Sequence, residues 1–388
     1  MKIIEVNSPA TIKDFLYVPR IIYKKDPNWI VPLEQDIEAV FDKKKNKFFR
    51  HGDAIRWVMK DDKGFLNGRV AAFINQKTAR TFKQPTGGMG FFECVDDKEA
   101  AFALFDKCKH WLTERGMEAM DGPVNFGERD RWWGLLTDGF TEPNYCMSYN
   151  LRYYKYLFES YGFKPYFNQY TYSRKVKEGG LDKTVQEKAE RIHKNPAYSF
   201  KHIEKKYYEK YADDFRIVYN KAWVKHRGVG EMSKPQALSI MKKLLPVMDE
   251  RIMWFAYFED EPIGFFINLP ELNQIFKHVN GKLNLMGKIK FLYHKKMKTC
   301  KKMFGIAFGV APEYQGRGIE SALVIAISTY VWKKKAPYID FEMNWIGDFN
   351  PKMMRVAENM GGKIHKTHIT YRKLFDDNAH FERAPIIE

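Results

Sequence analysis

The spacing of apolar residues changes from helical to strand-like within the second half of the chain. Apolar positions recur at helical spacing over residues 211–225 and 233–249, which predicts two helices. Residues 252–258 and 263–269 are short, strongly apolar runs, which predict two strands joined by the acidic turn at residues 259–262. The pattern therefore predicts two helices followed by a β-hairpin.

Further along, apolar runs of strand length and helix length alternate. Residues 304–310 predict a buried strand, residues 319–334 a largely apolar helix, and residues 338–344 another strand. A helix that starts near Asn350 precedes a final strand around residues 365–375. Alternation of this kind is typical of an α/β protein with a mixed central sheet flanked by helices.

The first half repeats much of this plan. Strands are predicted at residues 55–60, 65–75 and 90–95, followed by a helix at residues 98–115. A strand near Met120 and a helix near residues 153–161 continue the same order. Matching glycine and asparagine positions recur about half a chain length apart, which indicates a duplicated domain.

A chain of 388 residues exceeds the usual size of one hydrophobic core, so two domains are expected. We predict an N-terminal domain over residues 1–177, a charged linker over residues 178–195 that carries Gly179 and Gly180, and a C-terminal domain over residues 196–388.

The composition favours a soluble cytoplasmic protein. The first 25 residues lack an apolar stretch of signal-peptide length, and no segment approaches the roughly 20 apolar residues that a membrane span needs. Four cysteines form no C-x-x-C pair and no zinc-like spacing, which favours a reducing compartment and no metal site. No G-x-S-x-G elbow or phosphate-binding P-loop motif is present, so hydrolase and P-loop functions have no support.

The chain is basic, with a formal net charge of +17. Its densest patch is residues 277–302, with nine lysines and no acidic residue. The patch is interpreted either as a solvated helix face or as a contact for phosphate or nucleic acid. Charge alone does not separate nucleic acid, membrane surface and phosphorylated cofactor as partners.

The strongest local motif lies between the predicted strand at residues 304–310 and the helix at residues 319–334. A helix start offers unpaired backbone N–H groups, and glycines allow a phosphate to approach the main chain. Arg317 adds positive charge at this place. The motif consists of Gln315, Gly316, Arg317, Gly318 and Ile319.

In this order of elements the motif resembles the GCN5-related N-acetyltransferase (GNAT) superfamily, whose diphosphate-binding signature is Q/R-x-x-G-x-G/A. The whole chain resembles its long bacterial members with two tandem domains. The resemblance implies an N-acyltransferase with acetyl-CoA as donor and a primary amine, on a small molecule or a peptide, as acceptor. It also implies that CoA contacts the motif together with Phe308, Gly309, Val310 and Asn350.

Two departures from the family pattern concern the site. Glu320 replaces the small residue that ends the signature, so an alternative is a loop that caps itself and binds no cofactor. Ala357 stands where the family often has a tyrosine acid. We therefore expect Glu342 to accept the proton of the amine through water and Asn344, on the same face of the strand, to orient it. Burial is expected to raise the pKa of Glu342. A structural ion pair is the alternative for Glu342, and Tyr371 is a weaker candidate acid.

The first half has Asp96, Asp97 and Glu99 in place of the glycine loop, so we expect one CoA site per chain. By the same resemblance, Arg227 and Glu231 are candidate acceptor contacts. Two rival functions stay open: a non-catalytic protein that binds nucleic acid or membrane through its basic surface, and a transferase that uses aminoacyl-tRNA.

Overall fold

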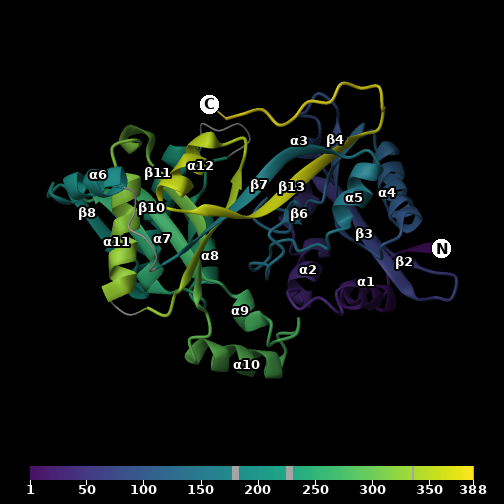
Figure 1. Cartoon of the computed structure of the whole chain (residues 1–388), viewed down its shortest axis with the longest axis horizontal. Helices are drawn as coiled ribbons and strands as arrows, with labels where there is room; N and C mark the ends of the chain where they lie inside the picture. The colour runs from purple at the N-terminus through teal and green to yellow at the C-terminus, as the bar shows by residue number, and fades with distance from the viewer. Residues whose placement is uncertain (177–182, 224–229, 334–335, 388) are drawn as a thin grey trace.

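Thirteen strands form one mixed sheet through the described part of the chain, with helices on both faces (Figure 1). The structure is a computed structural model that describes residues 1–176, 183–223, 230–333 and 336–387. The strands follow the order β1-β2-β3-β4-β5-β13-β7-β12-β11-β10-β9-β8, and β6 also pairs with β13. The predicted α/β class with a mixed sheet flanked by helices is confirmed.

Both halves contain the predicted series of helices and strands. In the first half these are β1 (Lys2–Glu5), α1 (Pro9–Ile22), α2 (Glu34–Phe41), β2 (Gly52–Lys60), β3 (Leu66–Asn75), α3 (Gln76–Ala79), β4 (Thr86–Cys94), α4 (Lys98–Thr113), β5 (Ala119–Gly122), β6 (Leu135–Asp138), α5 (Tyr154–Ser160) and β7 (Lys164–Lys175). The second half has α6 (Lys183–His193), β8 (Tyr198–His202), α7 (Tyr208–Trp223), α8 (Lys234–Leu244), β9 (Met253–Phe258), β10 (Glu261–Pro270), α9 (Asn273–Phe276), α10 (Leu285–Lys296), β11 (Lys302–Val310), α11 (Ile319–Lys333), β12 (Asp340–Gly347), α12 (Pro351–Asn359) and β13 (Lys363–Leu374).

Local chemistry explains where several of these elements begin and turn. The Ser233 N–H, at the start of α8, donates to the Gln236 side chain at 2.8 Å, half of the reciprocal pattern of a capping box. Glu259 and Asp260 have φ of 47° and 68°, the left-handed conformation that closes a two-residue hairpin between β9 and β10. The predicted hairpin is therefore present.

The last strand of each half lies among strands of the other half. β13 lies between β5 and β7, and Tyr371 of β13 is in register with Gly122 of β5. β7 lies between β13 and β12, where Tyr170 is in register with Ile346. Each half thus supplies a strand that extends the sheet of the other (Figure 1).

The predicted linker at residues 178–195 contains a packed helix rather than only a connector. In α6, Val185, Ala189 and Ile192 are buried, and the helix packs along α11. Gly179 and Gly180 lie outside the described residues. The charged composition of the segment hid an apolar stripe at helical spacing.

Alternating side chains of the sheet divide between separate cores. Phe341 and Met343 of β12 pack into the core beneath α11 and α12, and Phe255 and Phe265 pack into the core beneath α7 and α8. Because successive residues of a strand face opposite sides, Glu342 and Asn344 point away from α11. Both polar side chains lie against Asn144, which belongs to the first-half segment between β6 and α5.

Candidate functional site

The sheet opens between two parallel strands of the second half. β11 and β12 are in register from Lys302 and Asp340 to Gly305 and Met343, where their pairing ends. β11 nevertheless stays paired with β10 as far as Val310. The two strands therefore separate and leave a split, and the loop that follows Val310 lies beyond its open end.

The loop has the backbone shape that the motif predicts. Gly316 and Gly318 have φ of 72° and 104°, a region that glycine occupies without strain. The Gln315 side-chain amide donates to the Val310 carbonyl at 2.9 Å and fixes the turn. Ile319, fully buried, starts α11. The loop thus leads from the split directly into the N-terminus of a helix, a place that favours an anion.

Glu320 reaches back into this loop. The Gly316 N–H donates to the Glu320 carboxylate at 3.4 Å, a long hydrogen bond at an exposed position. A carboxylate in the first turn is itself favourable for the helix dipole. The self-capping contact that was the alternative to cofactor binding is therefore present, and a phosphate at Gly316 would have to displace it.

Helix α6 contributes cationic residues at the loop that the sequence interpretation missed. The Arg191 guanidinium donates to the Arg317 carbonyl at 3.1 Å. A Cβ added to Gly318 would lie 3.1 Å from Lys188 Cβ, so α6 covers one side of the loop. The side at Gly316 is open. The helical spacing of apolar residues in α6 was a signal for the helix, but not for its position beside the loop.

A buried polar cluster surrounds Glu342 on the opposite face of the sheet from α11. Glu342 is 3% exposed, and its carboxylate lies 2.7 Å from Lys302 Nζ and 3.5 Å from Lys366 Nζ. The Asn144 amide donates to the Glu342 carboxylate at 2.6 Å and to Asn344 Oδ1 at 3.2 Å. The structure thus brings Glu342 and Asn344 together through a residue of the first half.

The expected raised pKa of Glu342 is wrong. Burial alone would raise the pKa of this carboxyl, but the nearby Lys366 and Lys302 cations and the hydrogen bonds to Lys302 and Asn144 outweigh burial and lower it. Burial also lowers the pKa of Lys366, whose Nζ donates to the Glu142 carbonyl at 2.7 Å. Glu342 is therefore ionised at neutral pH.

The structure places Tyr371 away from this cluster. Its side chain is fully buried in the first-half core, and its hydroxyl donates to Glu159 at 3.0 Å. Burial raises the pKa of Tyr371, with the charge of Glu159 acting in the same direction. On β13, Tyr371 is in register with β5. Lys363, at the other end of β13, is in register with Ser173, which is also the register partner of Glu342. Glu342 therefore lies near the end of β13 opposite to Tyr371.

The other residues predicted to contact CoA or the acceptor lie at several different places in the second half. Asn350 caps α12, because its side chain accepts from the Met353 N–H at 3.1 Å. Phe308 packs edge-on against Phe266, with ring centroids 4.7 Å apart. Gly309 continues the pairing of β11 with β10. Glu231 is exposed before α8. Arg227 lies outside the described residues.

His365 of β13 is a further titratable neighbour of Glu342. Its Nε2 lies 3.9 Å from the Glu342 carboxylate and 3.0 Å from Thr141 Oγ1. Burial lowers the pKa of His365, so the ring is neutral at pH 7. Its side chain is about one-third exposed, which distinguishes it from the buried His368, bonded to the Ser148 carbonyl.

The loop before α4 takes the place of the glycine loop in the first half, and it is not open as the loop at Gly316 is. The Asp97 carboxylate accepts from the Ala100 N–H at 3.0 Å and caps α4. The N-terminus of this helix is therefore occupied by its own chain.

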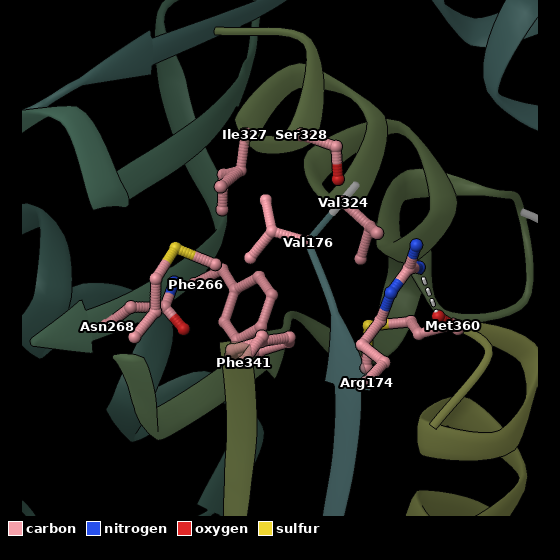
Figure 2. Close-up of a pocket in the computed structure, with 10 residues that line it drawn as sticks. Arg174, Val176, Phe266, Asn268, Val324, Ile327, Ser328, Phe341 and Met360 are labelled. Carbon is pink, nitrogen blue, oxygen red and sulfur yellow. Dashed lines mark hydrogen bonds between the residues drawn. The ribbon is translucent and has the colours of Figure 1, made fainter. Parts of the chain in front are cut away.

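Two cavities adjoin these elements. The first, with about 390 Å³ of empty space partly open to solvent, lies between the sheet and α11. Figure 2 shows Val324 and Ile327 of α11 facing Phe266 and Phe341 of the sheet across it. Phe341 lies in the paired segment of β12, so this cavity is at the closed end of the split. Its lining is mainly apolar.

The second cavity, with about 780 Å³ of empty space including open solvent, is lined mainly by the first half, with Asn273 of α9 also in its wall. Its walls are rich in aromatic side chains, among them Trp29, Phe91 and Trp132. Pro143 and Tyr145, which flank Asn144, form part of the wall. The segment that contacts Glu342 therefore also borders this cavity.

Within the described residues, no group of histidine, cysteine or acidic side chains is arranged to hold a metal ion. Among the same residues, no helix is long and apolar enough to cross a membrane. All four cysteines are buried and carry free thiols.

No protein-family model matches the chain. Two proteins are similar over most of its length. The bacterial ceramide synthase of Caulobacter vibrioides (strain NA1000 / CB15N) is 27% identical over 381 residues, 96% of this chain and 97% of that protein. Protein YghO of Escherichia coli (strain K12) is 24% identical over 371 residues, 93% of this chain and 92% of that protein.

Solved structures share the fold. A tandem GNAT protein from the clavulanic acid biosynthesis pathway matches with a TM-score of 0.57 and 10% identity, over 97% of this chain and 99% of that one. A GCN5-related glucosamine N-acetyltransferase region of a fungal multi-domain β-N-acetylglucosaminidase matches with a TM-score of 0.56 and 13% identity, over 96% of this chain but only 38% of that longer one. The continuous mixed sheet and these matches show that the chain has the fold of the tandem GCN5-related N-acetyltransferases.

Proposed function

We propose that the protein is an acyl-CoA-dependent N-acyltransferase with its CoA site in the second half. The observation that carries the proposal is the split between β11 and β12, which leads to a glycine loop at the N-terminus of α11. In this proposal the diphosphate lies near the open Gly316, with Arg317 and Arg191 as nearby cations, and displaces Glu320. The pantetheine lies in the split along residues 308–310.

We propose a fatty acyl donor and a long-chain amine acceptor. The similar protein from Caulobacter is named a ceramide synthase, and a ceramide is the amide of a fatty acid and a long-chain amino alcohol. Acetyl-CoA, the donor expected from the family resemblance, is the shortest member of the same class.

In the proposed reaction the neutral amine attacks the thioester carbonyl carbon, so that a C–N bond forms and the C–S bond breaks. The amine loses a proton, and the CoA thiolate gains one. Glu342, with its lowered pKa, is a poor proton acceptor at neutral pH, so we assign it a positioning role together with Asn344. His365, neutral and partly exposed beside Glu342, is the proposed proton acceptor through water.

The acceptor is proposed to bind where the first half meets the second. The aromatic cavity supports this, because its wall includes the residues on either side of Asn144. Arg227 and Glu231 stay proposed acceptor contacts. Tyr371 has no part in this mechanism.

The test is a transfer assay with purified full-length chain. Acetyl-CoA and palmitoyl-CoA are each incubated with sphinganine, and the amide product and released thiol are measured. Sphinganine already acetylated on nitrogen is the control, because it lacks the attacking group. Amide formation that needs both substrates supports the proposal. Absence of product with every donor, in protein that is folded, contradicts it, and dependence on charged tRNA would favour the aminoacyl-transfer alternative.

A further inference from the structure

Helix α10 has two apolar faces, and only one of them packs on the protein. On the packed face, the Phe291 ring stacks on Phe276 with centroids 5.6 Å apart, and the His294 ring stacks on His278 at 3.9 Å. In Figure 1, α10 lies at the periphery of the molecule, below the sheet and its other helices. The helix is therefore held by one side and presents its other side outward.

The outward face is apolar. Leu285 is 77% exposed, Leu292 62% and Ile289 53%, and Met286 and Tyr293 are also exposed. With about 100° between successive residues, these five side chains occupy an arc of about 120° on the helix. An exposed apolar stripe of this width marks an interaction surface rather than scattered surface leucines.

Lysines surround this stripe. Lys288 and Lys290 lie on either side of it, and Lys296 and Lys298 stand at its C-terminal end. Residues 277–302 contain nine lysines and no acidic side chain. A helix with an apolar face and a lysine border fits the interface of an anionic bilayer, with aliphatic side chains in the acyl boundary and ammonium groups at the headgroups.

Other occupants fit this surface less well. Nucleic acid would bind the lysines, but it would leave the aliphatic side chains without a partner. A second copy docked on the same face would bring two lysine borders together, and like charges repel. We propose that α10 docks the protein on the surface of anionic membranes.

The position of α10 gives this docking a role. Asn273 of α9, the short helix before α10, lines the aromatic cavity, and Tyr145 in the cavity wall packs on Phe276 with centroids 5.1 Å apart. A bilayer at α10 therefore lies beside the cavity to which we assign the lipid amine. That assignment rests on the proposed function, whereas membrane binding does not require any transfer reaction.

The proposal is tested by sedimentation of full-length protein with vesicles of phosphatidylcholine alone or mixed with phosphatidylglycerol. We expect binding to the mixed vesicles that weakens as salt is raised, because the lysines contribute through screened charge. The triple variant Leu285→Ser, Ile289→Ser, Leu292→Ser should bind at least about tenfold more weakly, since it removes most of the buried apolar area. Phe65→Ser, at an exposed phenylalanine of the first half, is the matched control and should bind normally.

A second measurement keeps the test independent of folding effects. Brominated lipids in the mixed vesicles should quench more of the indole fluorescence of Leu292→Trp than of the parent protein, which already contains nine tryptophans. The proposal would be overturned by lack of binding to the mixed vesicles, by equal binding of the triple variant, or by no added quenching in Leu292→Trp relative to the parent protein. Self-association that the triple variant abolishes would assign the apolar face to a second copy of the chain and would also overturn the proposal. RNA binding that competes with vesicles and is retained by the triple variant would assign the lysines to nucleic acid, with the same consequence.

Discussion

The side-chain amide of Asn144 donates a hydrogen bond to the carboxylate of Glu342 at 2.6 Å, across 198 residues of sequence. The same carboxylate holds Lys302 of β11 and Lys366 of β13. Glu342 therefore connects the first-half segment between β6 and α5 with two strands of the second half. This connection makes it both a structural and a functional residue in the predictions that follow.

Replacing Glu342 by glutamine should destabilise the protein. The substitution leaves the buried Lys366 and the 14% exposed Lys302 without the counter-charge of Glu342. Removing one partner of a buried ion pair typically costs about 3–5 kcal/mol in the free energy of unfolding. Denaturant unfolding of the purified variant measures the loss. Glu382→Gln is the control, because its partner Lys83 and Glu382 itself are both well exposed, and it should change stability by less than about 0.5 kcal/mol. Equal stability of the two variants would contradict the ionised cluster.

The cluster also predicts how stability depends on pH. The pKa of Glu342 is lowered in the folded state, so the unfolded chain binds its proton first as the pH falls. The stabilisation is fully present above the unfolded value of about 4.3 and is lost as the pH falls through the folded pKa. Unfolding measured between pH 6 and pH 3 should show this acid loss in the natural protein and a smaller one in Glu342→Gln. Identical acid slopes would assign the loss to other carboxylates.

Removing the charge of Glu320 should strengthen CoA binding. Glu320 accepts from the Gly316 N–H, so a diphosphate has to displace a carboxylate and then lie near its negative charge. We expect Glu320→Gln to lower the dissociation constant of acyl-CoA by about three- to tenfold, measured by calorimetry. Glu313→Gln is the control within the same loop, since Glu313 pairs with Lys221 at 3.4 Å. Unchanged affinity in Glu320→Gln would show that the diphosphate binds elsewhere.

Each chain should bind one acyl-CoA at saturation. In the first half, the Asp97 carboxylate caps α4 at the position where a phosphate would need free N–H groups. Titration of protein of known concentration, followed by mass spectrometry of the intact complex, gives the ratio. Two molecules per chain would show that the first half also binds the cofactor.

The exchange of last strands predicts which fragment folds alone. A fragment of residues 196–388 lacks β7, which lies between β12 and β13, so both strands lose a neighbour. We expect this fragment to aggregate or remain unfolded, as measured by circular dichroism and gel filtration. A fragment of residues 164–388 retains β7 and should be more soluble. A well-folded 196–388 fragment would contradict the structural role of β7.

The sequence predicted the local elements well, because their signals lie within a few residues. The acidic turn at Glu259 and Asp260 is an example, since turns depend on neighbouring residues. Helix α6 was missed, although its apolar residues have helical spacing, because the surrounding charges suggested a linker. The local spacing of apolar residues therefore predicted most strands and helices, but it did not predict how they pack.

The properties of the candidate site depended on long-range contacts. Strand alternation placed Glu342 and Asn344 on one face. The direction of the Glu342 pKa shift depends on Lys302 and Lys366, which come from two other strands, and on Asn144 from the other half. A single sequence does not show which strands become neighbours, so the expected raised pKa followed from burial alone and was wrong.

The place of β13 in the sheet also bears on synthesis at the ribosome. Residues 363–374 pair with β5, which is complete at residue 122. A nascent chain thus carries the β5 edge without its final partner while more than half of the protein is still being translated. An unpaired edge is a place where chains aggregate, so the interval before release is when this protein most needs a chaperone to cover it.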